Sequence, residues 1–216
     1  VLCGARRNKG RDWIQPHRVF IRRGTKAARL TLLRSMLVQR PSLSGDDAGQ
    51  TRLAALVEQI EASGGRAETI GGVTLFTEVE GLNDRLDTDI FVPWLAVTGV
   101  SDMEEALTLD TGMSYALGAS IFGPVPEATR IARRLRSGSI CINDLIVPTA
   151  DPRLPFGGAG ASGYGVTRGP EGLLALTRPV VTSVRRNQVI KASGFIARVA
   201  RRVTKSRYLR SLNGRI

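Results

Sequence analysis

Short apolar segments alternate with amphipathic helical segments along most of the chain, and this alternation constrains the fold more than any other feature. The helical period is clearest at residues 50–63, where Leu53, Leu56 and Ile60 share one stripe and Gly64 follows as a C-terminal cap. The other apolar runs are shorter and rich in β-branched residues, which predicts strands. Strands that alternate with helices predict an α/β domain with a largely parallel sheet flanked by helices.

The same reasoning places the remaining elements. Further helices are expected at residues 26–39, 101–109, 126–136 and 171–176. Strands are expected at residues 18–22, 66–70, 73–79, 94–100, 119–122, 139–143 and 179–184. Residues 101–104 (Ser-Asp-Met-Glu) form a capping box, and residues 151–165 form a glycine-rich loop.

The positive charge of the chain is concentrated at one end. The formal net charge is +12, and residues 185–216 carry ten Lys or Arg and no Asp or Glu. The rest of the chain is therefore nearly neutral, and the basicity belongs to a tail. Apolar residues in this tail fall at helical spacing, which is compatible with weak contact to an anionic membrane. The alternatives are a solvated helix and a disordered tail, and nucleic-acid binding is disfavoured because aromatic residues for base stacking are few.

The compartment follows from the cysteines and from the hydropathy pattern. The two cysteines, Cys3 and Cys141, provide no disulfide framework, so a reducing cytoplasm is the default. No apolar run is long enough to span a membrane, and no secretory leader opens the chain. We therefore expect a cytoplasmic protein, with peripheral membrane contact through its tail as an alternative.

One segment resembles a catalytic motif with its central residue replaced. Residues 8–20, which begin Asn-Lys-Gly-Arg-Asp-Trp, resemble the nucleophile segment of the aldehyde dehydrogenases. In that family the residue five positions after the Asn is the catalytic cysteine, and here it is Trp13. An indole has no ionisable nucleophile, whereas the family's chemistry needs a thiolate to attack the carbonyl carbon. The resemblance therefore predicts the family and argues against its activity, with no catalytic residue assigned.

Other segments resemble the same family in the same order. Asp89–Pro93 resembles its Glu-x-Phe-Gly-Pro segment. Further similar segments lie at residues 104–107, 115–122, 139–144, 154–158, 162–165 and 169–177. Each is a weak signal, but the ordered set is specific, and it covers the C-terminal part of a full-length member.

The resemblance implies a domain organisation and a cofactor. Residues 1–177 correspond to an N-terminally truncated catalytic domain, residues 178–184 to an oligomerisation-type strand, and residues 185–216 to a basic tail without a counterpart. The cofactor is NAD or NADP by resemblance. Asp89 stands where a Glu holds the nicotinamide ribose hydroxyls, and Phe91 where a Phe lies near the nicotinamide ring. Such enzymes bind the cofactor mainly through an N-terminal Rossmann-like domain, so we expect little binding by this chain alone.

Several other residues have a functional and a structural interpretation. Trp13 either stacks on a ligand as a pocket wall or packs in a degenerate site. Cys141 is expected to be a buried small hydrophobe, and His17 a surface or hydrogen-bonded histidine. Residues 158–163 match G-x-G-x-x-G but do not join a strand to a helix, so we interpret them as a close-packed turn. No cluster has the spacing of a metal site.

The functional expectation has three alternatives. The family reaction is NAD(P)-dependent oxidation of an aldehyde to a carboxylic acid, and we expect this chain to be a truncated, inactive member. It could instead assemble with itself or with a full-length relative through residues 178–184. It could also contribute half of a complemented enzyme, which Trp13 opposes.

Overall fold

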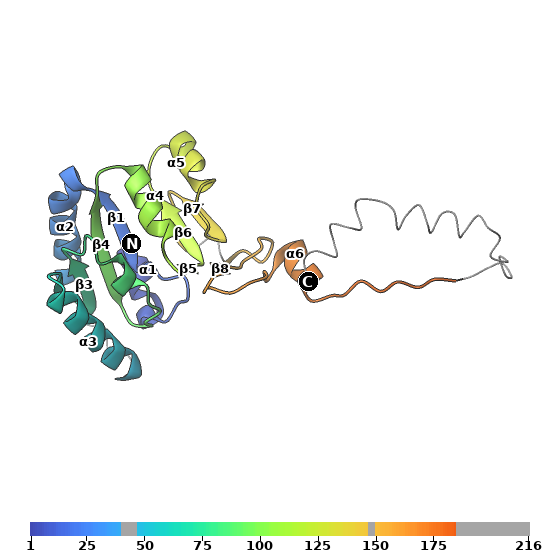
Figure 1. Cartoon of the computed structure of the whole chain (residues 1–216), viewed down its shortest axis with the longest axis horizontal. Coiled ribbons are helices and arrows are strands. Elements are labelled where there is room, and N and C mark those ends of the chain that lie inside the picture. The colour runs from blue at the N-terminus through green and yellow to red at the C-terminus, as the bar shows by residue number, and fades with distance from the viewer. Residues whose placement is uncertain (40–46, 147–149, 185–216) are drawn as a thin grey trace, which may run out of the picture. The chain divides into compact units, whose positions relative to one another are not determined.

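The computed structural model describes residues 1–39, 47–146 and 150–184, and their elements follow one another along the chain as drawn in Figure 1. The helices are α1 (Leu2–Arg6), η1 (Arg7–Gly10), α2 (Arg23–Val38), α3 (Asp47–Ala62), η2 (Asn83–Leu86), α4 (Met103–Thr111), α5 (Val125–Ala132) and α6 (Gly169–Ala175). The strands are β1 (Arg18–Arg22), β2 (Arg66–Ile70), β3 (Val73–Thr77), β4 (Trp94–Val100), β5 (Tyr115–Ala116), β6 (Gly118–Ile121), β7 (Ser139–Ile142) and β8 (Ala159–Gly160).

The largest sheet has the order β1-β4-β3-β2. Strand β4 runs parallel to both β1 and β3, with Val19 opposite Val97 and Leu75 opposite Leu95. Strand β2 pairs antiparallel with β3 through a turn at Gly71 and Gly72, both with positive φ. A separate parallel pair joins β6 to β7, and a short antiparallel pair joins β5 to β8. The α/β class with a largely parallel sheet is therefore confirmed.

Two apolar cores lie on opposite faces of this sheet, because successive residues of a strand point to opposite faces. Every residue of β3 and β4 is buried. On one face α1 and α2 cover the strands, through the buried residues Leu2, Ala5, Leu30, Leu37, Val73, Leu75, Leu95 and Val97. On the other face α3 covers them, through the core that contains Leu53, Leu56, Ile60, Phe76, Trp94 and Ala96. The apolar stripe predicted for residues 50–63 is thus the buried face of α3.

Helix α4 begins with the predicted type of cap, displaced by one residue. Asp102 is the N-cap, and its carboxylate accepts a hydrogen bond of 3.0 Å from the amide of Glu105. The Glu105 carboxylate in turn accepts from the amide and hydroxyl of Ser101 at 2.6 and 2.7 Å. The N-cap is therefore Asp102, so the prediction of Ser101 was wrong by one position, and Glu105 binds back to Ser101 and not to the amide of the N-cap.

The strand expected at residues 179–184 is not formed. These residues lie in no helix or strand, and Val180, Val181 and Val184 are 75%, 91% and 74% exposed. A β-strand needs a neighbour to accept and donate its backbone hydrogen bonds, and no described segment pairs with this one. Residues 1–177 form one compact unit and residues 178–216 fall into another. The basic tail predicted at residues 185–216 lies outside the described residues. Each described helix is too short or too polar to cross a bilayer.

Candidate functional site

A cavity of ≈ 1160 Å³ brings together the three residues that the sequence singled out. Trp13, Asp89 and Phe91 all line it, although they come from segments that are far apart in the chain. Trp13 precedes β1, whereas Asp89 and Phe91 precede β4. Because β1 and β4 are parallel neighbours, the segments that lead into them lie at the same end of the sheet.

A glycine allows these two segments to approach closely. Gly10 has a φ of +78°, and a Cβ at this position would lie 2.4 Å from the backbone nitrogen of Pro93 and 2.4 Å from the carbonyl carbon of Val92. Only glycine tolerates both the positive φ and this backbone contact. Gly10 therefore fixes the loop that carries Trp13 against the segment that carries Phe91.

Hydrogen bonds and an aromatic stack also join residues 15–17 to residues 90–94. The Gln15 amide donates to the Val92 carbonyl at 3.1 Å and also to Nε2 of His17. The His17 ring stacks on Trp94 with ring centroids 4.2 Å apart and planes inclined by 8°. Nε1 of Trp94 donates to the Ile90 carbonyl at 3.1 Å. His17 is thus a hydrogen-bonded structural histidine, as predicted, and Gln15 is a residue that no local sequence signal identified.

This environment keeps the His17 imidazole neutral. Burial, assisted by the positive charge of Arg18 and opposed by Asp89, lowers the pKa of His17 to about 4. The hydrogen bond from Gln15 requires an unprotonated Nε2 as acceptor, in agreement with the lowered pKa. His17 is half-buried at the cavity, and its neutral ring, stacked on Trp94, is a structural element and a weak base.

Trp13 itself does not pack in the interior. Its side chain is 78% exposed at the wall of the cavity, so the expectation of a packing residue was wrong. The reason is the loop around it, since Asn8, Lys9 and Gly10 all have positive φ and direct the chain along the surface. An exposed indole beside a cavity offers a flat stacking surface and no nucleophile.

Asp89 and Phe91 are accessible to a ligand from the cavity. The Asp89 carboxylate accepts a hydrogen bond of 2.9 Å from the Arg52 guanidinium, with side chains 48% and 55% exposed. An ion pair this exposed contributes at most about 1 kcal/mol, so a diol could replace Arg52 at low cost. Phe91 is half-buried at the same wall. The cavity wall therefore presents a hydrogen-bond acceptor, the Asp89 carboxylate, beside the flat apolar ring of Phe91.

The two thiols lie in different environments. Cys3 is exposed and does not line the cavity, whereas Cys141 in β7 is buried and does line it. Burial, with a further contribution from Asp144, raises the pKa of the Cys141 thiol. A thiol with a raised pKa is mostly protonated at neutral pH and is a poor nucleophile. Cys141 is therefore the buried hydrophobe that the sequence predicted.

An ion pair inside the cavity was not predicted from the sequence. Arg18 at the start of β1 donates to Asp110 of α4 at 3.5 Å, and both side chains are largely shielded from solvent. Burial raises the pKa of Asp110, although the charges of Arg18 and Arg136 oppose this rise. The two residues are 92 positions apart, and only the packing of α4 beside β1 brings them together.

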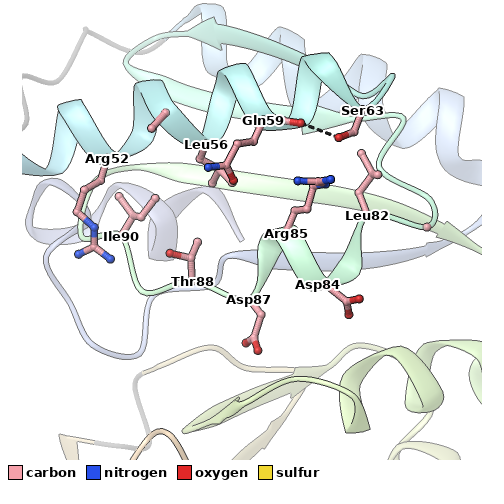
Figure 2. Close-up of a pocket in the computed structure, with 12 residues that line it drawn as sticks. Arg52, Leu56, Gln59, Ser63, Leu82, Asp84, Arg85, Asp87, Thr88 and Ile90 are labelled. Atoms are coloured by element: carbon pink, nitrogen blue, oxygen red, sulfur yellow. Dashed lines mark hydrogen bonds between the residues drawn. The ribbon is translucent and has the colours of Figure 1, made fainter.

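A second hollow of ≈ 850 Å³ lies between α3 and η2. Figure 2 shows the Arg85 side chain pointing toward α3, while Asp84 and Asp87 point away from it. The two carboxylate oxygens of Asp87 accept hydrogen bonds of 3.1 and 3.0 Å from the Ser114 amide. Arg52 at one end of this hollow is the partner of Asp89, so the hollow adjoins the larger cavity. Its lining contains neither Cys nor His and offers no nucleophile.

The G-x-G-x-x-G match at residues 158–163 is a close-packed turn, as predicted. A Cβ on Gly158 would lie 2.6 Å from Cβ of Ser162, and one on Gly160 would lie 2.3 Å from the Ser114 carbonyl oxygen. The turn contains β8 and is not followed by a helix that could bind a pyrophosphate. In the part of the chain that the structure describes, no group of three or more His, Cys, Asp or Glu could hold a metal ion.

Comparison with known sequences identifies the family. A sequence model described as "Aldehyde dehydrogenase family" matches residues 46–181, a range that begins after Trp13. A probable succinate-semialdehyde dehydrogenase [NADP(+)] of Synechocystis sp. is 32% identical over 173 residues, which cover 72% of this chain and 37% of that protein. A putative succinate-semialdehyde dehydrogenase [NADP(+)] 2 of Mycobacterium ulcerans is 38% identical over 106 residues, covering 48% of this chain and 20% of that protein. The chain thus spans less than half the length of these relatives.

Solved structures show the same fold. Betaine aldehyde dehydrogenase of Staphylococcus aureus in complex with NAD+ superposes with a TM-score of 0.74 at 20% identity, covering 81% of this chain and 39% of that one. Aldehyde dehydrogenase of Mycobacterium tuberculosis complexed with NAD+ gives a TM-score of 0.71 at 22% identity, covering 82% and 42%. Both matches extend over most of the described residues.

Proposed function

Because the chain belongs to the aldehyde dehydrogenase family, we propose that it keeps the fold of that family without its aldehyde-oxidising chemistry. The observation that carries this proposal is the exposed Trp13 at the wall of the cavity. The family reaction begins with attack of a thiolate on the carbonyl carbon of the aldehyde. An indole cannot form that bond, and the buried Cys141 is disfavoured as a substitute by its raised pKa.

In this proposal the cofactor-facing surface is partly retained. Asp89 would accept hydrogen bonds from the ribose hydroxyls of NAD or NADP, and Phe91 would lie against the nicotinamide. When bound, the nicotinamide ring supplies a hydride acceptor. Arg52 would have to release Asp89 for this contact, so we expect weak cofactor binding by this chain alone.

The first test is turnover by the full chain. With succinate semialdehyde or acetaldehyde and either NAD or NADP, we expect no rise in absorbance at 340 nm above the blank. Removal of a catalytic nucleophile typically lowers kcat by about 10⁴- to 10⁶-fold, which places any residual rate below detection. Turnover that disappears on Cys141→Ser, with the fold retained, would contradict the proposal.

The second test restores the nucleophile. A hybrid in which this chain replaces the matched part of the Synechocystis relative should be inactive with Trp13 and active with Trp13→Cys. Because Trp13 is 78% exposed, its replacement leaves the core intact, so a difference in activity would reflect chemistry and not folding. Equal activity of the two hybrids would show that the nucleophile position is assigned wrongly.

An assembly role is the second candidate, supported by exposed backbone. Residues 180–184, four of them β-branched, are exposed and without a strand partner among the described residues, so they offer donors and acceptors to another chain. The partner would be a second copy or a full-length relative. Contact of residues 185–216 with an anionic membrane remains a separate proposal.

A further inference from the structure

Helix α2 exposes apolar side chains on the side that points away from the sheet. Leu32 and Met36 are 53% and 42% exposed, and Ala28 is exposed as well. These three residues are spaced four positions apart, so they form one row along the helix. At about 100° per residue, Leu32 lies roughly 150° around the helix from the buried Leu30 and Leu37. The row therefore lies opposite the contacts that α2 makes with the core.

The helix on the other face of the sheet has no such row. Helix α3 has the same length as α2, 16 residues, and covers the same strands from the opposite side. All its residues are described, and none of its large apolar side chains is exposed. Its large exposed side chains are polar, namely Gln50, Arg52, Glu58, Gln59 and Glu61. The exposed row is thus a property of α2 and does not follow from the position of a helix over a sheet.

The charge around the row is positive. Arg29 lies beside Leu32 on the helix surface, is exposed, and has no ion-pair partner among the described residues. The other basic residues of α2 have acidic partners, which are Glu105 for Arg23, Glu80 for Lys26 and Glu68 for Arg34. Residues 13–45 contain seven Lys or Arg and no Asp or Glu. A partner of this row should therefore be apolar and negatively charged, and a second copy of α2 would meet its own charge.

The size of the row favours a lipid surface over a protein partner. A helix of 16 residues is about 24 Å long and about 10 Å wide. That strip is small beside the roughly 800 Å² that each partner buries in a stable protein interface. A helix that lies in the plane of a membrane surface inserts only a few apolar side chains, and neighbouring basic residues add attraction to anionic lipids. The outer side of α2 has both of these features.

We infer that the outer row of α2 is a membrane-contact surface, which inserts Leu32 and Met36 into an anionic lipid surface with Arg29 beside the lipid phosphates. The chain carries a second source of attraction, because residues 185–216 contain ten Lys or Arg and no Asp or Glu. One weak signal gives marginal membrane binding, and a second signal strengthens it. Here α2 supplies apolar contact and the tail supplies charge. The inference is independent of the proposed loss of catalysis and extends the proposal for the tail, from which the experiment separates it.

The first measurement is sedimentation of the full chain with phosphatidylcholine vesicles that contain about 30% phosphatidylserine. The double variant Leu32→Ser with Met36→Ser should lower the partition coefficient by at least about tenfold, because it loses both inserted side chains. Both side chains are exposed, so the fold should be retained. The matched control is Leu173→Ser with Leu174→Ser in α6, at positions 67% and 69% exposed, which should leave binding unchanged.

Salt and charge variants separate the two contributions. Arg29→Gln should weaken binding to the anionic vesicles by about fivefold and leave binding to pure phosphatidylcholine unchanged. In about 1 M salt every form should bind more weakly, because charges are screened. The ratio between the unchanged chain and the serine variant should remain about tenfold, because apolar insertion is not screened. If Arg201→Gln with Arg202→Gln has no effect while the α2 variants do, the tail proposal fails and the α2 inference is supported.

The second measurement locates the contact on the molecule. In the full chain with Trp13→Phe, Met36→Trp places an indole in the row, while Trp94 stays buried in the core. Brominated lipids in the vesicles should quench the fluorescence of the new indole. The matched control is Trp13→Phe with Glu58→Trp, which places an exposed indole on α3 at the opposite face of the sheet. That indole should stay in water and remain unquenched.

Three results would overturn the inference. The first is equal binding of the unchanged chain and the α2 serine variant, or an equal loss in the α6 control, which would mean that no contact is specific to α2. The second is an unquenched indole at position 36 on vesicles that bind the chain. The third is a vesicle-free chain whose dimer becomes a monomer on Leu32→Ser, as measured by light scattering, which would mean that a second copy covers the row.

Discussion

At the scale of single residues, His17 shows how strongly the interior determines a side chain's chemistry. It is the only histidine in the chain, and it lies four residues after Trp13, within the segment that resembles a catalytic motif of the family. It stacks on Trp94 and accepts a hydrogen bond from Gln15, and burial lowers its pKa to about 4. Histidine often performs acid–base catalysis, but here it helps to hold together the two segments that carry Trp13 and Phe91.

The lowered pKa makes stability depend on pH. Above pH 6.5 the imidazole is neutral in both the folded and the unfolded chain, and the full stability is present. Between pH 6.5 and about 4 the unfolded chain binds a proton at His17 that the folded chain does not bind. The free energy of unfolding should therefore fall as the pH is lowered through this range, by up to about 3 kcal/mol. Urea unfolding across this range checks the prediction. His17→Phe, which keeps a stacked ring, should lack this component.

The NMR titration of the same residue provides an independent measurement. Because the chain has one histidine, its imidazole carbon-bound proton can be assigned without ambiguity. A midpoint near 4 supports the buried, neutral ring. A midpoint of 6 or above would show that His17 is exposed and would remove the expected pH dependence.

At the scale of elements, two loops that precede parallel strands are fixed by backbone contact. Gly10 at the end of η1 packs against the Val92 and Pro93 backbone, and Gln15 donates to the Val92 carbonyl. These contacts join segments that are about eighty positions apart and place Trp13 and Phe91 at one cavity. The geometry of the candidate site therefore depends on a glycine that carries no functional group.

Gly10→Ala should destabilise the chain by more than about 2 kcal/mol, because alanine disfavours a φ of +78° and its Cβ would clash with backbone at 2.4 Å. The matched control is Gly24→Ala in α2, where no atom lies within 4 Å of an added Cβ. The control should leave stability unchanged or raise it by up to about 1 kcal/mol. Urea midpoints at constant slope measure both. Similar effects of the two substitutions would disprove the close approach of Gly10 to residues 92–93.

At the scale of the whole molecule, two strand edges and one exposed segment have backbone groups that no other strand of the described chain pairs with. The edges of β1 and β6 line one cavity, and the exposed residues 178–184 form no strand within the described chain. Unpaired edges and exposed β-branched segments are templates for association with another chain. Arg178 begins this segment and Arg185 and Arg186 follow it, and their charges oppose uncontrolled aggregation.

We expect the isolated chain to self-associate at micromolar concentration through residues 178–184. Val181→Pro removes one backbone donor and should shift the chain toward monomer, whereas Val181→Thr keeps the donor and should not. Light scattering measures the mass of all three proteins. A wild-type chain that is monomeric, and unchanged by the proline, would contradict this assignment.

Most elements and the family could be predicted from the sequence, because helical period, caps, turn glycines and ordered motifs act over a few residues. The stripe at Leu53, Leu56 and Ile60 placed α3, and Asp89–Pro93 identified a family segment that borders the cavity. Long-range packing, by contrast, brings Gln15 to the Val92 carbonyl and Arg52 to Asp89, and it leaves Trp13 exposed. These outcomes depend on strand register and on contacts between residues dozens of positions apart, which no local pattern specifies. The same reason explains why residues 179–184 have the composition of a strand without forming one: composition favours extension, but pairing requires a neighbouring backbone.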